Sequence, residues 1–289
     1  MYHVATHSGK FHADDVLAFA MLKEFLSPNL SLTRTRDMTL IEKADIVFDV
    51  GGIFNPENGR FDHHQKTYEG PLSSAGMVLN WLESEAHITP KMATTLRERI
   101  VNYVDDVDNG RLFPNPSTPC FSTIVDSFNH GCNDLDAFNN AFVKASQFAQ
   151  TMVRGFKIEM EEVTQAKNAV KEAMLQAEAR NSNMIILKEY IKWKPAYFEL
   201  GGAQHQTEFI VFPTLQNTYQ CVAISPEENS FAQKRSFPTE WAGLVDDELS
   251  AVCGVHDAVF CHKNRFLFIC KSQESVFKAM KAAKLLTED

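Results

Sequence analysis

Short apolar runs alternate with helical patterns from residue 1 to about 125. Strand-like runs occur at 3–5, 30–35 and 44–49, and a helical pattern covers 14–26. Strands that alternate with helices are typical of βαβ units and a mainly parallel sheet. We therefore expect the N-terminal part of the chain to form an α/β domain.

A long amphipathic helical region follows, from about 134 to 180. Its apolar residues recur at steps of three and four, which is the stripe of a helix that packs against a core. Gly155 is the position at which a break would fall. The stripe consists of Phe138, Phe142, Ala145, Ala149, Met152, Phe156, Met160 and Val163.

Strand-like patterns return after the helical region. They lie at 184–187, 209–212 and 258–270, where the polar triplet 263–265 separates the two halves of an expected hairpin. A closing helix is expected over 275–286. The chain thus divides into an N-terminal α/β domain over 1–130, a helical connector over 131–183 and a smaller C-terminal α/β domain over 184–289.

Composition narrows the classes of function. The 289 residues carry 28 basic and 37 acidic side chains, a net charge of −9, so no broad basic face for duplex nucleic acid is expected. The six cysteines form no C-x-x-C pair, which favours reduced thiols. No apolar stretch approaches the ~20 residues of a membrane span, and we expect a cytoplasmic protein.

Two clusters of polar residues follow expected strands. The first runs from His7 to Asp15, where the first strand ends and the first helix begins. Ligands collect outside the carboxyl ends of strands in open α/β sheets, although Asp14 or Asp15 could simply cap the helix. The second is Asp49, which ends a buried strand and precedes two glycines; a buried carboxylate is costly unless a cation pairs with it.

Two further clusters complete the set. Asp62-His63-His64 places adjacent imidazoles on an extended segment, where they would point to opposite faces, so that one could bind a metal and the other reach a substrate. Asp62 could orient an imidazole. Three carboxylates within 105–108 end a helix and oppose its dipole, which a cation would relieve; a solvated turn at Asn109-Gly110 is the alternative.

Together the clusters offer imidazole and carboxylate ligands without thiolates. This set suits Mn²⁺, Mg²⁺, Fe²⁺ or Zn²⁺ rather than copper(I) or iron–sulfur centres. A carboxylate such as Asp49 could bridge two ions, as in two-metal phosphoester hydrolysis. The candidate ligands are His7, His12, Asp14, Asp49, His63 and either Asp105 or Asp108.

The ordered motifs resemble the DHH phosphoesterase superfamily, and more closely the melanocyte-proliferating-gene family of metal-dependent hydrolases and 3′–5′ RNA exonucleases. The likeness covers most of the chain. It rests on segments 7–15, 34–37, 48–52, 60–65, 72–76, 105–110, 234–236, 241–244 and 259–262.

The resemblance implies a catalytic domain, a substrate-binding domain and an active site between them. It gives one Mn²⁺ to His7, His12 and Asp49, and a second to Asp14, Asp49, His63 and an aspartate of the fourth cluster, with Asp105 narrowly preferred to Asp108. His64, with Asp62, would face the scissile phosphate. The expected substrate is single-stranded nucleic acid or a nucleotide, and a homodimer is left open.

Basic side chains are the candidates for binding substrate phosphates. Arg34 and Arg36 alternate on an expected strand and would point the same way, and guanidinium groups suit phosphate. Arg235 and His262 are the candidates in the C-terminal domain. Each of these four could equally be a surface ion pair.

The chain also departs from the family pattern. It has His12 where most DHH enzymes have Asp, Ala13-Asp14-Asp15 where close relatives have Cys-Asp-Glu, and 264–267 in place of a glycine-rich ending. Two alternative functions are therefore retained. One is a pyrophosphatase-like or small-nucleotide phosphohydrolase, and the other is a metal-binding protein that acts through partners without catalysis.

Overall fold

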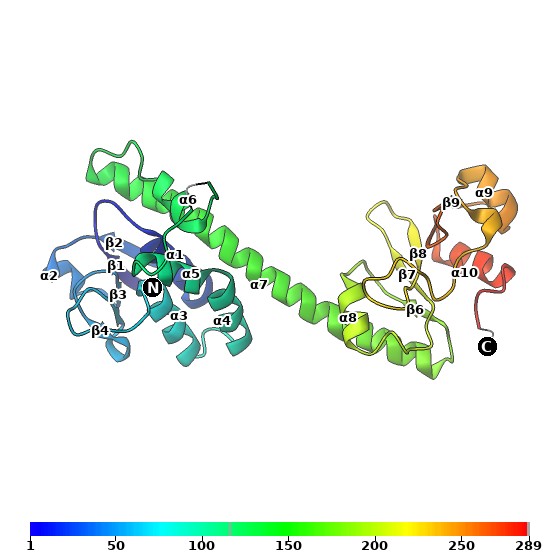
Figure 1. Cartoon of the computed structure of the whole chain (residues 1–289), viewed down its shortest axis with the longest axis horizontal. Coiled ribbons are helices and arrows are strands. Elements are labelled where there is room, and N and C mark those ends of the chain that lie inside the picture. The colour runs from blue at the N-terminus through cyan, green and yellow to red at the C-terminus, as the bar shows by residue number, and fades with distance from the viewer. Residues whose placement is uncertain (116, 288–289) are drawn as a thin grey trace. The chain divides into compact units, whose positions relative to one another are not determined.

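The computed structural model describes residues 1–115 and 117–287, and the chain forms two compact units (Figure 1). The units comprise Met1–Met160 and Glu161–Asp289, so their boundary falls inside the long helix α7 (Leu135–Ala179). No helix in the described part of the chain is long and apolar enough to cross a membrane.

The N-terminal unit is built on a five-stranded sheet of order β2-β1-β3-β5-β4. Every neighbouring pair is parallel except β4 with β5 at the edge. The carboxyl ends of β1, β3 and β5 therefore meet at one edge of the sheet. The strands are β1 (Tyr2–Thr6), β2 (Leu30–Arg34), β3 (Ile46–Phe48), β4 (Phe54–Asn55) and β5 (Arg60–Phe61).

Helices cover one face of this sheet and form the main core with it, except the short helix Met38–Ile41, whose Ile41 packs on the other face. Val4 of β1 and Ile46 and Phe48 of β3 pack into this core, whereas Ala5 and Val47 face a smaller apolar cluster on the other side. The helices are α1 (Ala13–Met21), α2 (Met38–Ile41), α3 (Ser74–Ser84), α4 (Pro90–Leu96), α5 (Asn102–Asp108) and α6 (Phe121–Ser127), with π-helical turns η1 (Leu22–Leu26) and η3 (Arg97–Val101) and the 3₁₀ turn η2 (Pro56–Asn58).

The C-terminal unit holds a second five-stranded sheet, of order β6-β7-β8-β10-β9, in which only β6 and β7 are parallel. Side chains of β7 alternate between two cores: Phe209 and Val211 face one, Ile210 and Phe212 the other. The elements are β6 (Met184–Ile186), α8 (Trp193–Glu199), β7 (Phe209–Pro213), β8 (Tyr219–Ala223), η4 (Thr239–Trp241), α9 (Asp246–Cys253), β9 (Ala258–Cys261), β10 (Leu267–Cys270) and α10 (Gln273–Ala282).

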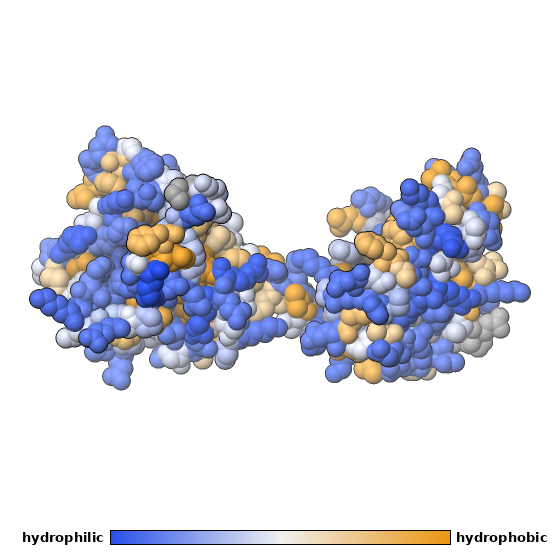
Figure 2. Space-filling model, in the orientation of Figure 1, coloured by the Kyte–Doolittle hydropathy of each residue, from blue (hydrophilic) through white to orange (hydrophobic). Residues whose placement is uncertain are grey.

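The predicted α/β class, the long connecting helix and the C-terminal sheet are confirmed. The predicted hairpin is the antiparallel pair β9 and β10. A break at Gly155 is not found, because α7 continues through it. The division at residues 130 and 183 remains a prediction. Figure 2 shows that the visible surface of both units is mainly hydrophilic with scattered apolar side chains.

Candidate metal centre

The loop between β1 and α1 brings two histidines and two aspartates together. Asp14 and Asp15 lie in the first turn of α1 and are both fully buried. Asp15 Oδ1 accepts a hydrogen bond from the His12 backbone N–H at 3.0 Å, and Asp15 Oδ2 lies 3.2 Å from His7 Nε2. Asp15 therefore ties both histidines of the loop to the helix.

Asp49 lies directly after β3 and is the centre of the cluster. Its backbone adopts a left-handed conformation with φ 55°, and its N–H donates to the Phe61 carbonyl of β5 at 3.1 Å. One carboxylate oxygen, Oδ2, is 3.2 Å from His7 Nε2, and the other, Oδ1, is 3.5 Å from His63 Nε2. Asp49 thus joins the histidine that follows β1 to the histidine that follows β5.

Asp62 supports the neighbouring loop and one imidazole. Its Oδ2 accepts a hydrogen bond of 2.6 Å from the backbone N–H of Gly52. The backbone of Gly52 has a φ of 67°, in the left-handed region that favours glycine. Its Oδ1 lies 2.8 Å from His64 Nδ1. Asp62 therefore orients His64.

The two adjacent histidines do not point to opposite faces, so that expectation was wrong. Their ring centroids are 4.3 Å apart, and both rings reach Asp49 Oδ1 at 3.5 Å. The strand β5 ends at Phe61, and the alternation of side chains that holds within a strand does not extend to residues 63 and 64. His63 is nearly buried, whereas His64 is largely exposed.

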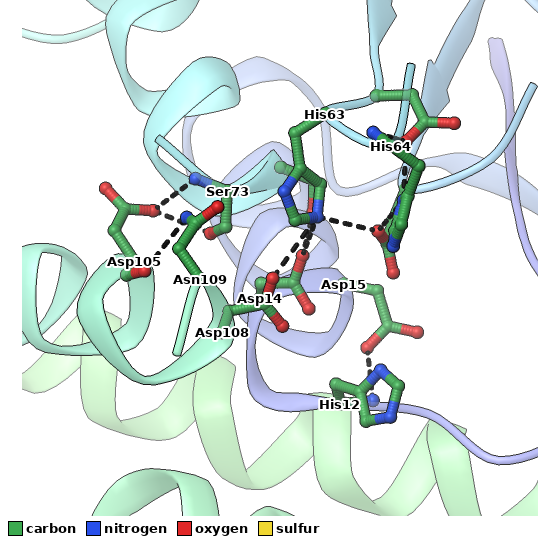
Figure 3. A network of polar contacts seen from close by, with 12 residues as sticks. His12, Asp14, Asp15, His63, His64, Ser73, Asp105, Asp108 and Asn109 are labelled. Carbon is green, nitrogen blue, oxygen red and sulfur yellow. Dashed lines mark hydrogen bonds and ion pairs between the residues drawn. The ribbon is translucent and has the colours of Figure 1, made fainter. Parts of the chain in front are cut away.

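Asp105 and Asp108 occupy different environments although both lie on α5 (Figure 3). Asp105 Oδ1 accepts hydrogen bonds from the backbone N–H and the hydroxyl of Ser73, at 3.0 and 2.6 Å, and from the N–H of Gly76 at 3.2 Å. Asp108 Oδ2 instead lies 3.2 Å from His63 Nε2. The structure places Asp108 in the cluster, whereas Asp105 anchors the start of α3.

Several buried atoms of the cluster have no hydrogen-bond partner. They are Asp14 Oδ1, Asp15 Oδ2, Asp49 Oδ1 and His63 Nε2, and the last three have only ion-pair contacts of 3.2–3.9 Å within the cluster. Buried polar atoms are otherwise paired in folded proteins, so each such atom calls for an explanation such as a bound ion. The carboxylates are crowded together, and a divalent cation would supply the missing partner for all of them.

The pKa values of the cluster reflect this crowding. Burial raises the pKa of Asp14 well above its usual value, and nearby Asp49 and Asp108 raise it further. Burial alone would lower the pKa of His7, but Asp15 and Asp49 outweigh it and raise the pKa to about 10. Burial would likewise raise the pKa of Asp49, but His63 and His7 lower it to about 2.

Four overlapping groups within the cluster could each hold a metal ion, because their ligand atoms all lie within 4.8 Å of one another. The first group is the set that the family resemblance gives to one ion. Asp49 belongs to three groups, as a bridging ligand would. The groups are His7, His12 and Asp49; Asp49, His63 and His64; His12, Asp14 and Asp108; and Asp14, Asp15 and Asp49.

The two N-terminal arginines lie near the cluster but in unlike positions. The strand β2 ends at Arg34, so Arg36 does not continue its alternation. Arg34 Nη2 donates to the Gly9 carbonyl at 2.8 Å, and its guanidinium packs over the Phe142 ring. Arg36 is exposed, and its Nη2 lies 3.4 Å from His7 Nδ1. Arg36 is therefore the more accessible of the two to a substrate.

The candidates in the C-terminal unit have partners within that unit. Arg235 donates to the backbone carbonyls of Lys284 and Leu285 at 2.6 and 3.2 Å and lies 3.4 Å from Glu208. His262 Nδ1 accepts a hydrogen bond from Asn264 N–H and its ring packs on Phe266. Both residues hold local structure, and their assignment to substrate remains a prediction.

Asp15 and the two serines at the start of α3 were not among the predicted site residues. Ser74 Oγ donates to Asp14 Oδ2 at 2.8 Å and so fixes that carboxylate. Gly76 is also required, since a Cβ atom there would lie 2.3 Å from Asp105 Oδ2. Ser73, Ser74 and Gly76 belong to one of the segments that carry the family resemblance. Only the fold reveals which aspartate each of them contacts.

Comparisons with known proteins agree on one family. The MYG1 exonuclease family, described as "Uncharacterised protein family (UPF0160)", matches residues 3–284. A MYG1 protein of Chlamydia trachomatis is 34% identical over 282 residues, covering 96% of this chain and 94% of the relative. A MYG1 protein of Chlamydia pneumoniae is 33% identical over 280 residues, covering 96% and 95%. The MYG1 exonuclease of Rattus norvegicus is 27% identical over 305 residues, covering 91% and 80%.

Proposed function

The chain belongs to the MYG1 family (UPF0160), a family of DHH-type phosphoesterases, and from this premise we propose that it is a metal-dependent phosphodiesterase of RNA or short oligonucleotides. The single observation that carries the proposal is a convergence of ligand atoms. Residues that follow β1, β3 and β5 meet Asp108 of α5 in one cluster, in which several buried atoms make no hydrogen bond. Stability alone does not account for such a cluster, because its carboxylates repel one another.

The ligand set fits two divalent ions that share Asp49. His7, His12 and Asp49 would hold one ion. The other would be held by His63 and by the three carboxylates near its Nε2, those of Asp14, Asp49 and Asp108 at 3.9, 3.5 and 3.2 Å. Asp108 takes the place for which Asp105 was narrowly preferred, because the Asp105 Oδ1 atom is fully engaged by Ser73 and Gly76. Oxygen and imidazole ligands suit Mn²⁺ best here, with Mg²⁺, Fe²⁺ and Zn²⁺ as alternatives.

Bound ions would supply a nucleophile from water and neutralise charge on the phosphoryl oxygens. His64 acts beside them. Its hydrogen bond with Asp62 raises its pKa, so the imidazolium form persists to higher pH. With Nδ1 turned toward Asp62, its Nε2–H can donate to a phosphate oxygen or to the leaving oxygen. Arg36 supplies a further positive charge at the exposed side of His7.

The substrate class follows from charge and from the family. The net charge of −9 disfavours long duplexes, since a short or single strand needs fewer phosphate contacts. The rat relative is named an exonuclease. We therefore propose single-stranded RNA or short oligonucleotides as substrates, shortened from the 3′ end.

Hydrolysis of a labelled oligoribonucleotide in the presence of Mn²⁺ tests the proposal. The wild type should shorten the strand, and Asp49→Ala and His63→Ala should lower the rate by about 10³-fold, since metal-assisted stabilisation contributes several kcal/mol. Asp37→Asn is the control, because Asp37 only caps α2 at the surface. Equal turnover in all four proteins would refute the proposal.

Two further measurements separate the alternatives. Elemental analysis of the purified protein identifies the ion, and phosphate release from pyrophosphate and small nucleotides tests the phosphohydrolase alternative. A protein that holds metal tightly but hydrolyses no phosphoester would be the non-catalytic metal-binding protein.

A further inference from the structure

A cavity of about 750 Å³ lies beside the candidate metal centre, within the N-terminal unit. His12, His63, His64 and Asp108 line it, so a ligand in the cavity contacts the centre directly. Pockets for small organic ligands measure about 300–1,000 Å³. The cavity is therefore large enough for a nucleotide whose phosphate lies at the ions.

Half of the remaining lining residues are apolar, and Lys10 and Asp126 are the charged ones among them. Ala13, Val104, Val107 and Pro114 contribute apolar side chains from the start of α1, from α5 and from the segment that follows it. Apolar side chains with a few placed polar groups are typical of sites for organic ligands. Such a lining suits the flat faces of a base and the carbon skeleton of a sugar.

The lysine of the cavity is already paired with a carboxylate. Among the lining residues, all of which the structure describes, Lys10 is the only one with an ammonium or guanidinium group, and its Nζ pairs with Asp126 Oδ1 at 2.9 Å. A second phosphate group would therefore find no free lysine or arginine among the lining residues beyond the metal centre and His64. The part of the ligand that enters the cavity should be uncharged.

Ser122 is a polar lining residue whose hydroxyl is available to bond to the uncharged part of the ligand. Its buried hydroxyl has no hydrogen-bond partner, so turning it toward the cavity breaks no hydrogen bond. In contrast, Thr123 Oγ1 bonds to the backbone of Cys120, and Asn109 Nδ2 bonds to the carbonyls of Pro71 and Asp105.

We propose that this cavity binds the nucleoside of the nucleotide whose phosphate lies at the metal centre, and that Ser122 is a specificity-determining contact. The inference rests on the proposed function, because it places a phosphate at the ions. It also narrows that function, since the cavity favours nucleoside phosphates over pyrophosphate and other compact polyanions.

Binding measurements test this inference without turnover. Isothermal titration calorimetry in Mn²⁺ would compare adenosine monophosphate, ribose 5-phosphate and pyrophosphate. We expect adenosine monophosphate to bind about tenfold or more tightly than ribose 5-phosphate and pyrophosphate, because only it fills the apolar cavity. Equal or tighter binding of pyrophosphate would overturn the proposal.

Variants of α6 give the matched comparison. Ser122→Met places a larger side chain at the wall of the cavity and should reduce the preference for adenosine monophosphate over pyrophosphate. Ser127→Met is the control, since Ser127 is exposed on the same helix and does not line the cavity. Ser122→Ala needs no repacking and should weaken the binding of adenosine monophosphate about fivefold, because one hydrogen bond is lost.

The outcomes distinguish the two proposals. If oligonucleotides are not hydrolysed but the preference and its reduction in Ser122→Met are found, the cavity assignment stands and the proposed function fails. If hydrolysis is found but the Ser122 and Ser127 variants bind adenosine monophosphate alike, the cavity assignment fails and the proposed function stands.

Discussion

The two units each bury a polar network, and the networks differ in how completely their atoms are paired. In the C-terminal unit, Lys234 Nζ donates to the carbonyls of Gly202, His205 and Thr207 at 2.7, 2.9 and 3.2 Å and to the Tyr197 hydroxyl at 3.1 Å. The Thr207 hydroxyl bonds to Tyr197 and His205 at 2.8 Å each. The ammonium group of Lys234 thus holds the loop after α8 against the segment after β8.

The cluster in the N-terminal unit shows the opposite arrangement. Asp14, Asp15 and Asp49 are buried beside one another, and each has a carboxylate oxygen without a hydrogen-bond partner. In the Lys234 network, His205 Nε2 is the one described buried atom without a hydrogen-bond partner, and it lies 3.2 Å from Glu178. A largely paired network stabilises the fold that contains it, whereas a cluster of several unpaired carboxylates costs free energy until something binds. The comparison therefore separates a structural network from a ligand site on physical grounds.

The histidines of the two networks differ in the same way. Carboxylates dominate the surroundings of His7 and raise its pKa to about 10. Burial dominates the surroundings of His205 and lowers its pKa, although Glu178 lies 3.2 Å from its Nε2. His205 is therefore neutral at pH 7 and belongs to the structure of its unit.

Within this comparison, the largest expected effect separates the two aspartates of α5. Asp108→Asn should lower kcat/KM on an oligoribonucleotide by about 10²-fold and reduce the bound metal, because a carboxylate ligand is lost. Asp105→Asn should lower kcat/KM by less than about tenfold, since an amide oxygen still accepts from Ser73 and Gly76. Asp106→Asn is the control, because Asp106 pairs with Arg111 at the surface. A larger loss in Asp105→Asn than in Asp108→Asn would reverse the assignment.

The next effect concerns the hydrogen-bond network around Lys234 in the C-terminal unit. Lys234→Met should lower the free energy of unfolding of the C-terminal unit by about 2 kcal/mol, because three carbonyl groups lose their donor. Urea unfolding followed by tryptophan fluorescence measures it, since Trp193 and Trp241 lie in the core of this unit. Lys263→Met is the exposed control. Equal stability of the two variants would mean that the network contributes nothing.

Much of the fold could be predicted because its elements have clear periodicity. The 44–49 run gives β3, and the stripe from Phe138 to Val163 gives a continuous α7. Gly155 did not break the helix, since a glycine costs only about 1 kcal/mol in a helix that packing supports. Local pattern and tertiary packing agree in these elements.

The site was predictable in its members but not in its contacts. The clusters at 7–15, 49, 62–64 and 105–108 do converge. The choice between Asp105 and Asp108 could not be made from the sequence, because both lie on one helix. Only the fold shows that Ser73 and Gly76 bond to Asp105, whereas His63 lies beside Asp108. Asp15 was left out because the family resemblance gives a metal to Asp14 alone, and either carboxylate could simply cap the helix.

A smaller effect of opposite sign would test the unpaired cluster. Asp14→Asn should raise the free energy of unfolding of the metal-free protein by about 1 kcal/mol, because it removes a buried carboxyl group that neighbouring carboxylates repel. The amide can still accept from Ser74 and adds donors toward Asp49 and Asp108. Thermal unfolding in a chelator measures the change, and a loss of stability would show that the carboxylate serves the fold.

The smallest effect is the pH dependence of the stability of the C-terminal unit, which His205 of the Lys234 network causes. His205 has a lowered pKa when folded and its usual value of 6.5 when unfolded, so below pH 6.5 the unfolded chain binds the proton more readily. The C-terminal unit should therefore lose stability as the pH falls below 6.5 and keep it above. Urea unfolding at about pH 7.5 and about pH 5 should show this loss in the wild type and a smaller one in His205→Gln. An identical pH dependence in both proteins would mean that Glu178 offsets burial and that His205 is protonated in the folded state, as His7 is in the metal-free cluster.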